Sequence, residues 1–240
     1  MPENKTAIIT GASGGIGAGL VQGFLSETYN VVATSRHTGQ SLTPSASLVL
    51  VDGDITQPET ASKTVDAAVA HFGAIDVLVN NAGIVLKKPF TEYTTDDFNA
   101  LVSTNLLGFF YMTQAVVKQM LKQNSGCVVS ISAALADQPF AGDRASVSML
   151  TKGGLNTITR SLAIEYAKQG IRFNAVAPGA VETPMHKDEF KQTLRTFQPM
   201  GKIVEVNDVV GAVLYLAQAG QVTGEVLHVD GGEHAGRWQP

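Results

Sequence analysis

The sequence is poor in charged residues, in aromatic residues and above all in cysteine. Only 16% of its 240 residues are charged and the formal net charge is −4, so no basic surface is expected to attract nucleic acid or an anionic membrane. A single cysteine, Cys127, excludes an intrachain disulfide and fits a reducing compartment. Because Cys127 lies in an apolar run, a buried core residue is the preferred interpretation over a reactive thiol.

Long hydrophobic runs are also missing. No apolar run approaches the ~20 residues needed to span a bilayer, and residues 1–5 lead directly into a strand-like segment, which leaves no room for a signal peptide. We therefore expect a soluble, cytoplasmic protein. With 44% hydrophobic residues the chain can bury a large core, and its length fits one α/β domain over 1–240.

Short β-branched runs alternate with longer segments of helical period. The expected strands are 7–10, 30–34, 48–51, 75–80, 127–131, 171–176 and 225–229, and the expected helices are 15–28, 58–72, 96–123, 146–169, 187–197 and 206–218. Strands separated by helices are typical of βαβ units, so we predict an α/β fold with a doubly wound parallel sheet of about seven strands and helices on both faces.

A glycine-rich turn at residues 10–17 follows the first strand and opens the first helix. Such a turn lets the backbone approach a pyrophosphate, whose charge the free N–H groups and the dipole of the helix stabilise. Since strand, turn and helix come in the required order, dinucleotide binding is preferred over a purely structural turn. The candidate contacts are Gly11, Ser13, Gly15, Ile16 and Gly17.

The end of the second strand indicates which dinucleotide is bound. An unmodified ribose usually meets an acidic residue there, whereas a 2′-phosphate requires an arginine. The chain has Ser35 and Arg36 at this place and no Asp or Glu between Glu27 and Asp52. Arg36 can make a bidentate contact to phosphate, although a solvated surface arginine is the alternative. We therefore predict NADP(H) as the cofactor.

The third strand ends at Asp52-Gly53-Asp54-Ile55 and the fourth at Asn80-Asn81-Ala82-Gly83, both rich in small and polar residues. The carboxyl ends of parallel strands meet at one edge of the sheet, so both turns should line the crevice of the glycine loop. Each turn alone could be only structural.

The helix expected at 96–123 has Thr95 as its N-cap and an apolar stripe that starts at Phe98. Asn105 lies on this stripe. A buried amide must find partners, so Asn105 either bonds a neighbouring backbone or organises water near a reacting centre.

These motifs, in order and spacing, resemble the short-chain dehydrogenase/reductase family, and most closely its bacterial ketoacyl-carrier-protein-reductase-like members. The likeness covers nearly the whole chain and implies a single-domain Rossmann-type oxidoreductase that acts on a small-molecule carbonyl or alcohol. Such proteins are usually dimers or tetramers. Besides the turns above, the residues that carry the resemblance are Asn105-Leu106-Leu107-Gly108, Lys152, Ala177-Pro178-Gly179 with Thr183, and Asp230-Gly231-Gly232.

The resemblance also implies roles for individual residues. Asp54 would contact the adenine, Asn81 and Gly83 the ribose side of the pocket, and Thr183 the nicotinamide carboxamide. Lys152 would bind the nicotinamide ribose, and Asn105 would hold a water of the proton relay. Ile55, Ala82, Pro178 and Gly179 complete the cofactor site, and no metal is expected.

Two catalytic positions depart from the family pattern. The family's active tyrosine lies four residues before the lysine, at Ser148 here, and its active serine falls on Ala133, with Ser132 one residue early. Hydride transfer to a carbonyl leaves an oxygen that needs a proton, and serine is a weaker and shorter acid than a phenol. We expect the Ser148 hydroxyl to stop short of the substrate with the gap open to water, and Ser148→Tyr to restore the acid.

Other acids are conceivable. Asp137, Asp143 and Arg144 lie in a loop about two residues longer than the family spacing, where a polar surface loop is the preferred interpretation. His186 is a further candidate proton donor, but the preferred interpretation is that it belongs to the lid. Four tyrosines lie in other elements, and none has the spacing to Lys152 that the family's active tyrosine has: Tyr93, Tyr111, Tyr166 and Tyr215.

Three functions therefore compete. The preferred one is carbonyl/alcohol interconversion with a modified relay through Ser148, Ser132 and water. The second is a catalytically silent NADP-binding subunit that regulates or stabilises a partner, and the third is an elimination or isomerisation in the same crevice. Residues 182–201 are expected to form a lid over a partly apolar substrate. We also expect a homo-oligomer, most readily a tetramer.

Overall fold

The computed structural model describes residues 4–183 and 198–236, and within these ranges the predicted α/β architecture is confirmed. The strands are β1 Thr6–Thr10, β2 Asn30–Ser35, β3 Leu48–Asp52, β4 Val77–Asn80, β5 Gly126–Ile131, β6 Ile171–Pro178 and β7 Val226–Val229. The main helices are α1 Gly15–Ser26, α2 Pro58–Phe72, α3 Thr95–Val102, α4 Gly108–Gln123, α5 Ser146–Tyr166 and α7 Val206–Gln218. The expected helix 187–197 lies outside the described residues.

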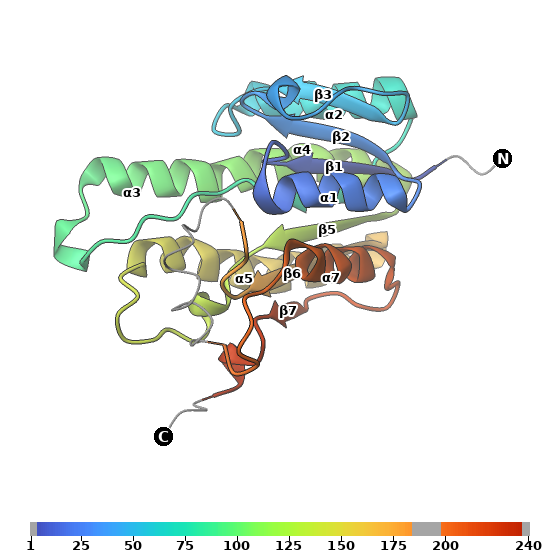
Figure 1. Cartoon of the computed structure of the whole chain (residues 1–240). Coiled ribbons are helices and arrows are strands. Elements are labelled where there is room, and N and C mark those ends of the chain that lie inside the picture. The colour runs from blue at the N-terminus through green and yellow to red at the C-terminus, as the bar shows by residue number, and fades with distance from the viewer. Residues whose placement is uncertain (1–3, 184–197, 237–240) are drawn as a thin grey trace.

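All seven strands are parallel and follow the order β3-β2-β1-β4-β5-β6-β7. Successive residues of a strand face opposite layers: Ile9 packs in a core with α1 and α7, and Ile8 in a second core with α2, α4 and α5. The helices therefore cover both faces, as Figure 1 shows. The strand order reverses between β1 and β4, and in open α/β sheets ligands bind beyond the carboxyl ends of the strands at this point.

The helical run that was expected as one helix is interrupted by a π-helix, η3, over Ser103–Leu107. A π-helix has i→i+5 bonding, so it shifts the phase of α4 relative to α3. The apolar stripe is consequently broken: Phe109 and Met112 are buried, but Phe98 is 43% exposed and does not face the core as predicted. The N-cap is also one residue earlier than expected, because the Thr94 hydroxyl accepts from the Asp97 N–H in a capping box.

The same run, Thr95–Gln123, is long and apolar enough to cross a membrane by length and composition alone. In this chain it serves as a core helix: Met112, Val116 and Met120 are fully buried against the sheet. Its apolar character is thus accounted for by packing.

Cys127 lies in the middle layer of the molecule, on β5. Its side chain is 2% exposed, and burial raises the pKa of the thiol to about 11. A thiol with so high a pKa is almost wholly protonated and a poor nucleophile. The interpretation as an inert core residue is therefore supported.

Candidate active site

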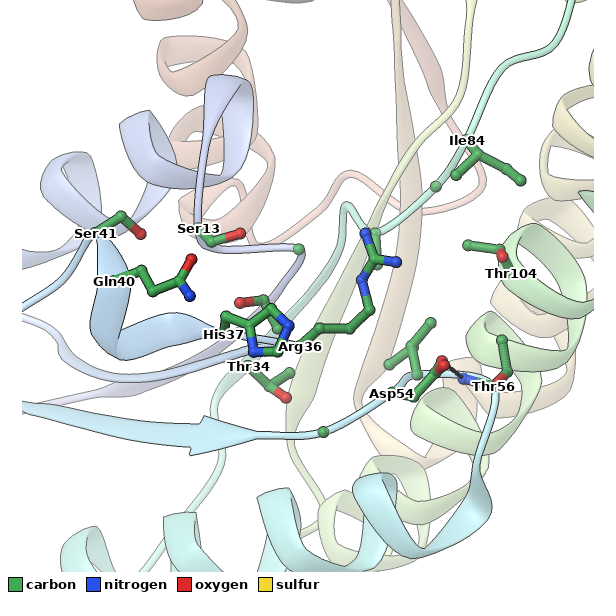
Figure 2. A pocket seen from close by; sticks show the side chains of 16 residues that line it. Ser13, Thr34, Arg36, His37, Gln40, Ser41, Asp54, Thr56, Ile84 and Thr104 are labelled. Atoms are coloured by element: carbon green, nitrogen blue, oxygen red, sulfur yellow. Dashed lines mark hydrogen bonds between the residues drawn. The ribbon is translucent and has the colours of Figure 1, made fainter. Parts of the chain in front are cut away.

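A cavity of about 520 Å³ opens at the carboxyl ends of β1, β2, β3 and β4, where the strand order reverses. Figure 2 shows its side chains converging from these four strand ends and from η3. The lining consists mostly of small and polar residues: Gly11, Ser13, Thr34, Ser35, Arg36, His37, Gln40, Ser41, Gly53, Asp54, Ile55, Thr56, Ala82, Gly83, Ile84 and Thr104.

The glycine loop is held by contacts that tolerate no larger residue. Gly11 has φ of +65°, a conformation that favours glycine. A Cβ at Gly17 would lie 2.1 Å from the Gly11 carbonyl oxygen, so the first turn of α1 touches the loop directly. The Asn81 side chain donates to the carbonyls of Thr10 and Gly11, at 2.9 and 3.2 Å. Asn81 therefore supports the loop from below.

The end of β2 and the residue after it line the cavity with Ser35 and Arg36. Ser35 Oγ is buried and has no hydrogen-bond partner. Across the cavity, one oxygen of the Asp54 carboxylate accepts from the Thr56 N–H at 2.9 Å. The β2 end thus offers donors where a bound anion would need them.

Lys152 and Asn105 meet at Gly83. Lys152 is 7% exposed, its ammonium donates to the Ile131 carbonyl at 2.7 Å, and burial lowers its pKa to about 8. A Cβ on Gly83 would lie 3.3 Å from Lys152 Nζ and 3.2 Å from Asn105 Oδ1, so both groups reach the cavity wall.

Asn105 satisfies its amide through protein contacts. It accepts from the Ile84 N–H at 2.8 Å, and its amide nitrogen donates to the Ile84 carbonyl and the Thr151 hydroxyl, at 3.0 and 2.9 Å. Of the two alternatives left open by the sequence, backbone bonding is the one these contacts support. The π-helix η3 presents Asn105 to this segment, and π-helices are frequent at functional sites.

Ser148 faces residues 84–88, which we call the strap. Its side chain is fully buried, its hydroxyl donates to the Leu86 carbonyl at 3.0 Å, and it accepts from the Leu86 N–H at 2.9 Å. Tyr93 donates to the same carbonyl at 2.6 Å. The expectation of a gap open to water beyond Ser148 was therefore wrong, because the strap backbone occupies this space.

Ser132 and Ala133 follow β5. The Ser132 hydroxyl is 3% exposed and donates to the carbonyl of Lys152 at 3.1 Å, so it anchors the backbone of α5. Ala133 carries no hydroxyl. Neither position offers a free acidic hydrogen to the cavity.

A family model described as Enoyl-(Acyl carrier protein) reductase matches residues 11–234 of the chain. The chain belongs to the short-chain dehydrogenase/reductase family. It is 32% identical to 3beta-hydroxysteroid dehydrogenase 1 of Eggerthella lenta, covering 96% of this chain and 94% of that protein. It is also 32% identical to the 3-oxoacyl-[acyl-carrier-protein] reductase FabG of Salmonella typhimurium, covering 96% and 97%.

Solved structures of this family show the same fold. ElxO with NADP bound superposes with a TM-score of 0.90 at 32% identity, over 97% of this chain and all of that chain. The 3-ketoacyl-(acyl-carrier-protein) reductase of Brucella melitensis, complexed with NADH, gives a TM-score of 0.90 at 28% identity, over 97% and 99%. Structures at 28–32% identity to this chain thus hold either NADP or NADH.

About half of the predicted cofactor residues line the cavity, namely Gly11, Ser13, Ser35, Arg36, Asp54, Ile55, Ala82 and Gly83. The others lie behind or beside it. Ile16 packs against the core, and Thr183 lies next to Gly15. Pro178 is the last residue of β6, and the N–H of the following residue, Gly179, donates to the Val229 carbonyl. Sequence reasoning missed His37, Gln40 and Ser41, although the polar run after β2 was the signal that could have found them.

The alternative acids are engaged elsewhere. Asp137 accepts from the Asn156 amide and is 3.1 Å from His228, and Asp143 pairs with Lys87 at 2.8 Å. The Arg144 carbonyl accepts from the Lys88 N–H. The loop that carries these acids therefore fastens the strap. The predicted lid lies mostly outside the described residues, as does His186.

The strap contact changes what a tyrosine at position 148 should do. In Ser148→Tyr, a phenol must displace the Leu86 backbone, so we expect a loss of about 1–3 kcal/mol of unfolding free energy by overpacking and no gain in turnover. Ser148→Ala is the matched control: it loses the same two hydroxyl contacts, together about 1–3 kcal/mol, but adds no overpacking, so it should be more stable than the tyrosine variant. Urea denaturation measures both. A tyrosine variant that is as stable as the parent and turns over faster would show that a phenol fits.

Proposed function

We propose that the protein is an NADP(H)-dependent oxidoreductase that interconverts a carbonyl and an alcohol by hydride transfer. The observation that carries this proposal is the cavity at the strand-order reversal, with Arg36 at one end and the Lys152–Asn105 pair beside Gly83. Relatives at 32% identity over nearly the whole chain are a hydroxysteroid dehydrogenase and a ketoacyl reductase, which supports the reaction class.

The residues present fit NADP(H). The unpartnered Ser35 hydroxyl and the Arg36 guanidinium suit a 2′-phosphate, and the glycine loop lets the backbone approach a pyrophosphate. Gly11, Ser13, Gly15 and Gly17 would serve the pyrophosphate, Asp54 and Ile55 the adenine side, and Asn81, Ala82, Gly83, Pro178, Gly179 and Thr183 the nicotinamide half. When bound, NADP(H) supplies or accepts the hydride.

In this proposal Lys152 holds the proton for the substrate oxygen. An ammonium has three N–H donors, and the Ile131 carbonyl takes one of them. Its pKa of about 8 lies near neutral pH, where a general acid is most effective. Ser148 gives its only hydrogen to Leu86, so these contacts do not support a relay through Ser148. Asn105 fixes Ile84 and thereby the cavity wall beside the ammonium.

A catalytically silent NADP-binding subunit is the second candidate, and the occupied Ser148 and the missing hydroxyl at Ala133 favour it. The test is a panel of ketones and aldehydes assayed by the loss of NADPH absorbance, beside a calorimetric titration with NADPH. Turnover supports the oxidoreductase. Binding without turnover on any member of the panel supports the silent subunit, and absence of binding refutes both.

Arg36→Asp should reverse the cofactor preference. A carboxylate at this position repels a 2′-phosphate and can accept from the ribose hydroxyls of NAD(H), so NADP⁺ affinity should fall by roughly tenfold or more while NAD⁺ affinity holds or rises. Calorimetric titration with each dinucleotide measures the ratio. Arg160→Asp, on the exposed face of α5, is the matched charge control. Equal affinities of the parent for both cofactors would contradict the role of Arg36.

The homo-oligomer and the cytoplasmic location remain predictions. Exposed apolar side chains on neighbouring helices are consistent with subunit contacts: Phe110 of α4 is 48% exposed, and Leu150 and Ile164 of α5 are 61% and 81% exposed.

A further inference from the structure

The C-terminal turn lies where three distant segments of the chain meet. This turn, η6, covers Glu233–Ala235 after β7 and packs against η4, Ala134–Ala136, in the loop between β5 and α5. Just before the turn, the Gly231 carbonyl accepts from the Met200 N–H at 3.2 Å. The strap lies close enough for its Lys87 to act on the Glu233 carboxyl. The turn therefore joins the loop, the strap and the segment around Met200.

One side of the turn is held by buried polar contacts. Asp230 is 2% exposed, and its carboxylate accepts from the N–H groups of Gly232 and His234, at 2.9 and 2.8 Å. The same carboxylate lies 2.8 Å from His234 Nδ1. The His234 ring stacks on the His228 ring with centroids 3.9 Å apart, and His228 Nε2 lies 3.1 Å from the Asp137 carboxylate. These contacts fasten the turn to β7 and to the loop.

Glu233 faces an excess of negative charge. The Asp143 side chain is only 6% exposed, and its Oδ2 atom pairs with Lys87 at 2.8 Å. Its Oδ1 atom is buried and has no hydrogen-bond partner in the part of the chain that the structure describes. With Asp230 and Glu233 itself, three carboxyl groups thus lie near one lysine. A negative charge on Glu233 is therefore unfavourable.

The protonation of Glu233 follows from this arrangement. Burial, and then the charges of Asp230 and Asp143, raise its pKa from 4.5 to about 7, and Lys87 opposes the rise. A carboxyl whose pKa is raised in the closed turn stabilises that turn at low pH. The stabilisation is complete below about pH 4.5, declines as the pH rises, and is lost above about pH 7.

We propose that Glu233 is a pH-dependent latch: its uncharged carboxyl lets the C-terminal turn close on the loop and the strap, and its carboxylate opens the turn by repulsion from Asp143. The inference goes beyond the proposed reaction, because the residues that line the cofactor cavity do not include those of the turn. Local opening of this kind leaves the rest of the sheet intact. Histidines in general also lose their proton in this pH range, so the test must separate Glu233 from His228 and His234.

The experiment is amide hydrogen exchange of the full-length protein from about pH 5 to 8, with each rate corrected for the intrinsic pH dependence of exchange. The amides of residues 232–235 are all hydrogen-bonded, so their protection reports the closed turn. Protection should fall about tenfold over this range and level off above about pH 7, a change limited by the solvent around a half-buried carboxyl. In Glu233→Gln, whose amide is uncharged, protection should be high and flat with pH.

Two further variants keep the test decisive. Glu225→Gln changes an exposed glutamate just before β7, so the turn should keep the pH dependence of the parent. Asp143→Asn removes a charge that raises the pKa of Glu233, so the fall in protection should level off at a lower pH. A fall that persists unchanged in Glu233→Gln would assign the pH dependence to His228 and His234 and overturn the latch. Protection of the parent turn that stays flat from about pH 5 to 8 would overturn it as well.

Discussion

Lys152→Met should lower carbonyl-dependent NADPH oxidation by roughly 10²–10⁴-fold, the usual worth of a positioned general acid. Methionine is similar in length and apolar, so it can occupy the same buried position while removing the ammonium that lies near Gly83. In the parent, the rate of reduction should fall as pH rises through about 8, because the acid is then lost by deprotonation. The variant should lose this pH dependence.

Steady-state kinetics over pH, with kcat and KM resolved, measure the effect, and Lys118→Met on the exposed face of α4 is the control. A methionine variant that keeps the parent rate and its fall near pH 8 would remove Lys152 from the proton path. An effect confined to NADPH affinity would reduce Lys152 to a cofactor contact.

Gly17→Ala should strongly disturb both the fold and cofactor binding. The new Cβ would lie 2.1 Å from the Gly11 carbonyl oxygen and 2.7 Å from the Asn81 amide, so the glycine loop must move. Overpacking of this kind costs about 1–3 kcal/mol, and backbone atoms yield less readily than a flexible side chain. We expect a fall in unfolding free energy of this size and at least a tenfold loss of NADP⁺ affinity, roughly 1.4 kcal/mol.

Gly14→Ala is the matched control on the same loop. Gly14 has extended backbone at φ −171°, and a Cβ there meets nothing within 4 Å. Because Gly14 is the N-cap of α1, alanine should cost roughly 0.5–1 kcal/mol there, less than the loss expected for Gly17→Ala. If the two alanine variants prove equally stable in urea, the close contact between α1 and the glycine loop does not contribute to the free energy of unfolding.

The strands were predictable because their signal is local. Central parallel strands are buried on both faces, so β4 and β5 are continuous apolar runs that flanking turns delimit. The π-helix was not predictable in this way. The sequence from Phe98 to Met120 keeps a regular helical period, and the π-helix coincides with bonds from Asn105 to Ile84 and Thr151, residues distant in sequence.

The surroundings of Ser148 show the same limit. Spacing located Ser148 on the face of Lys152, and both are buried on α5. Nothing local indicates that the Leu86 backbone, 62 residues earlier, takes both hydrogen-bonding directions of the hydroxyl. His37 was missed for a different reason: a polar run after a strand is equally typical of a solvated turn, whereas here the next residue, Thr38, is bonded to Asp52 and His37 lines the cavity.

The burial of Cys127 makes the modification rate of its thiol a measure of how often the sheet opens. Its thiol lies in the middle of the sheet and is the only one in the chain, so a thiol-specific reagent can modify it only in molecules whose sheet has opened. The rate of modification then counts opening events. A ligand that binds only the closed form makes such events rarer in proportion to its occupancy. Comparing the rate of Cys127 modification in the presence of NADP⁺ and of NAD⁺ therefore measures the cofactor preference without any substrate.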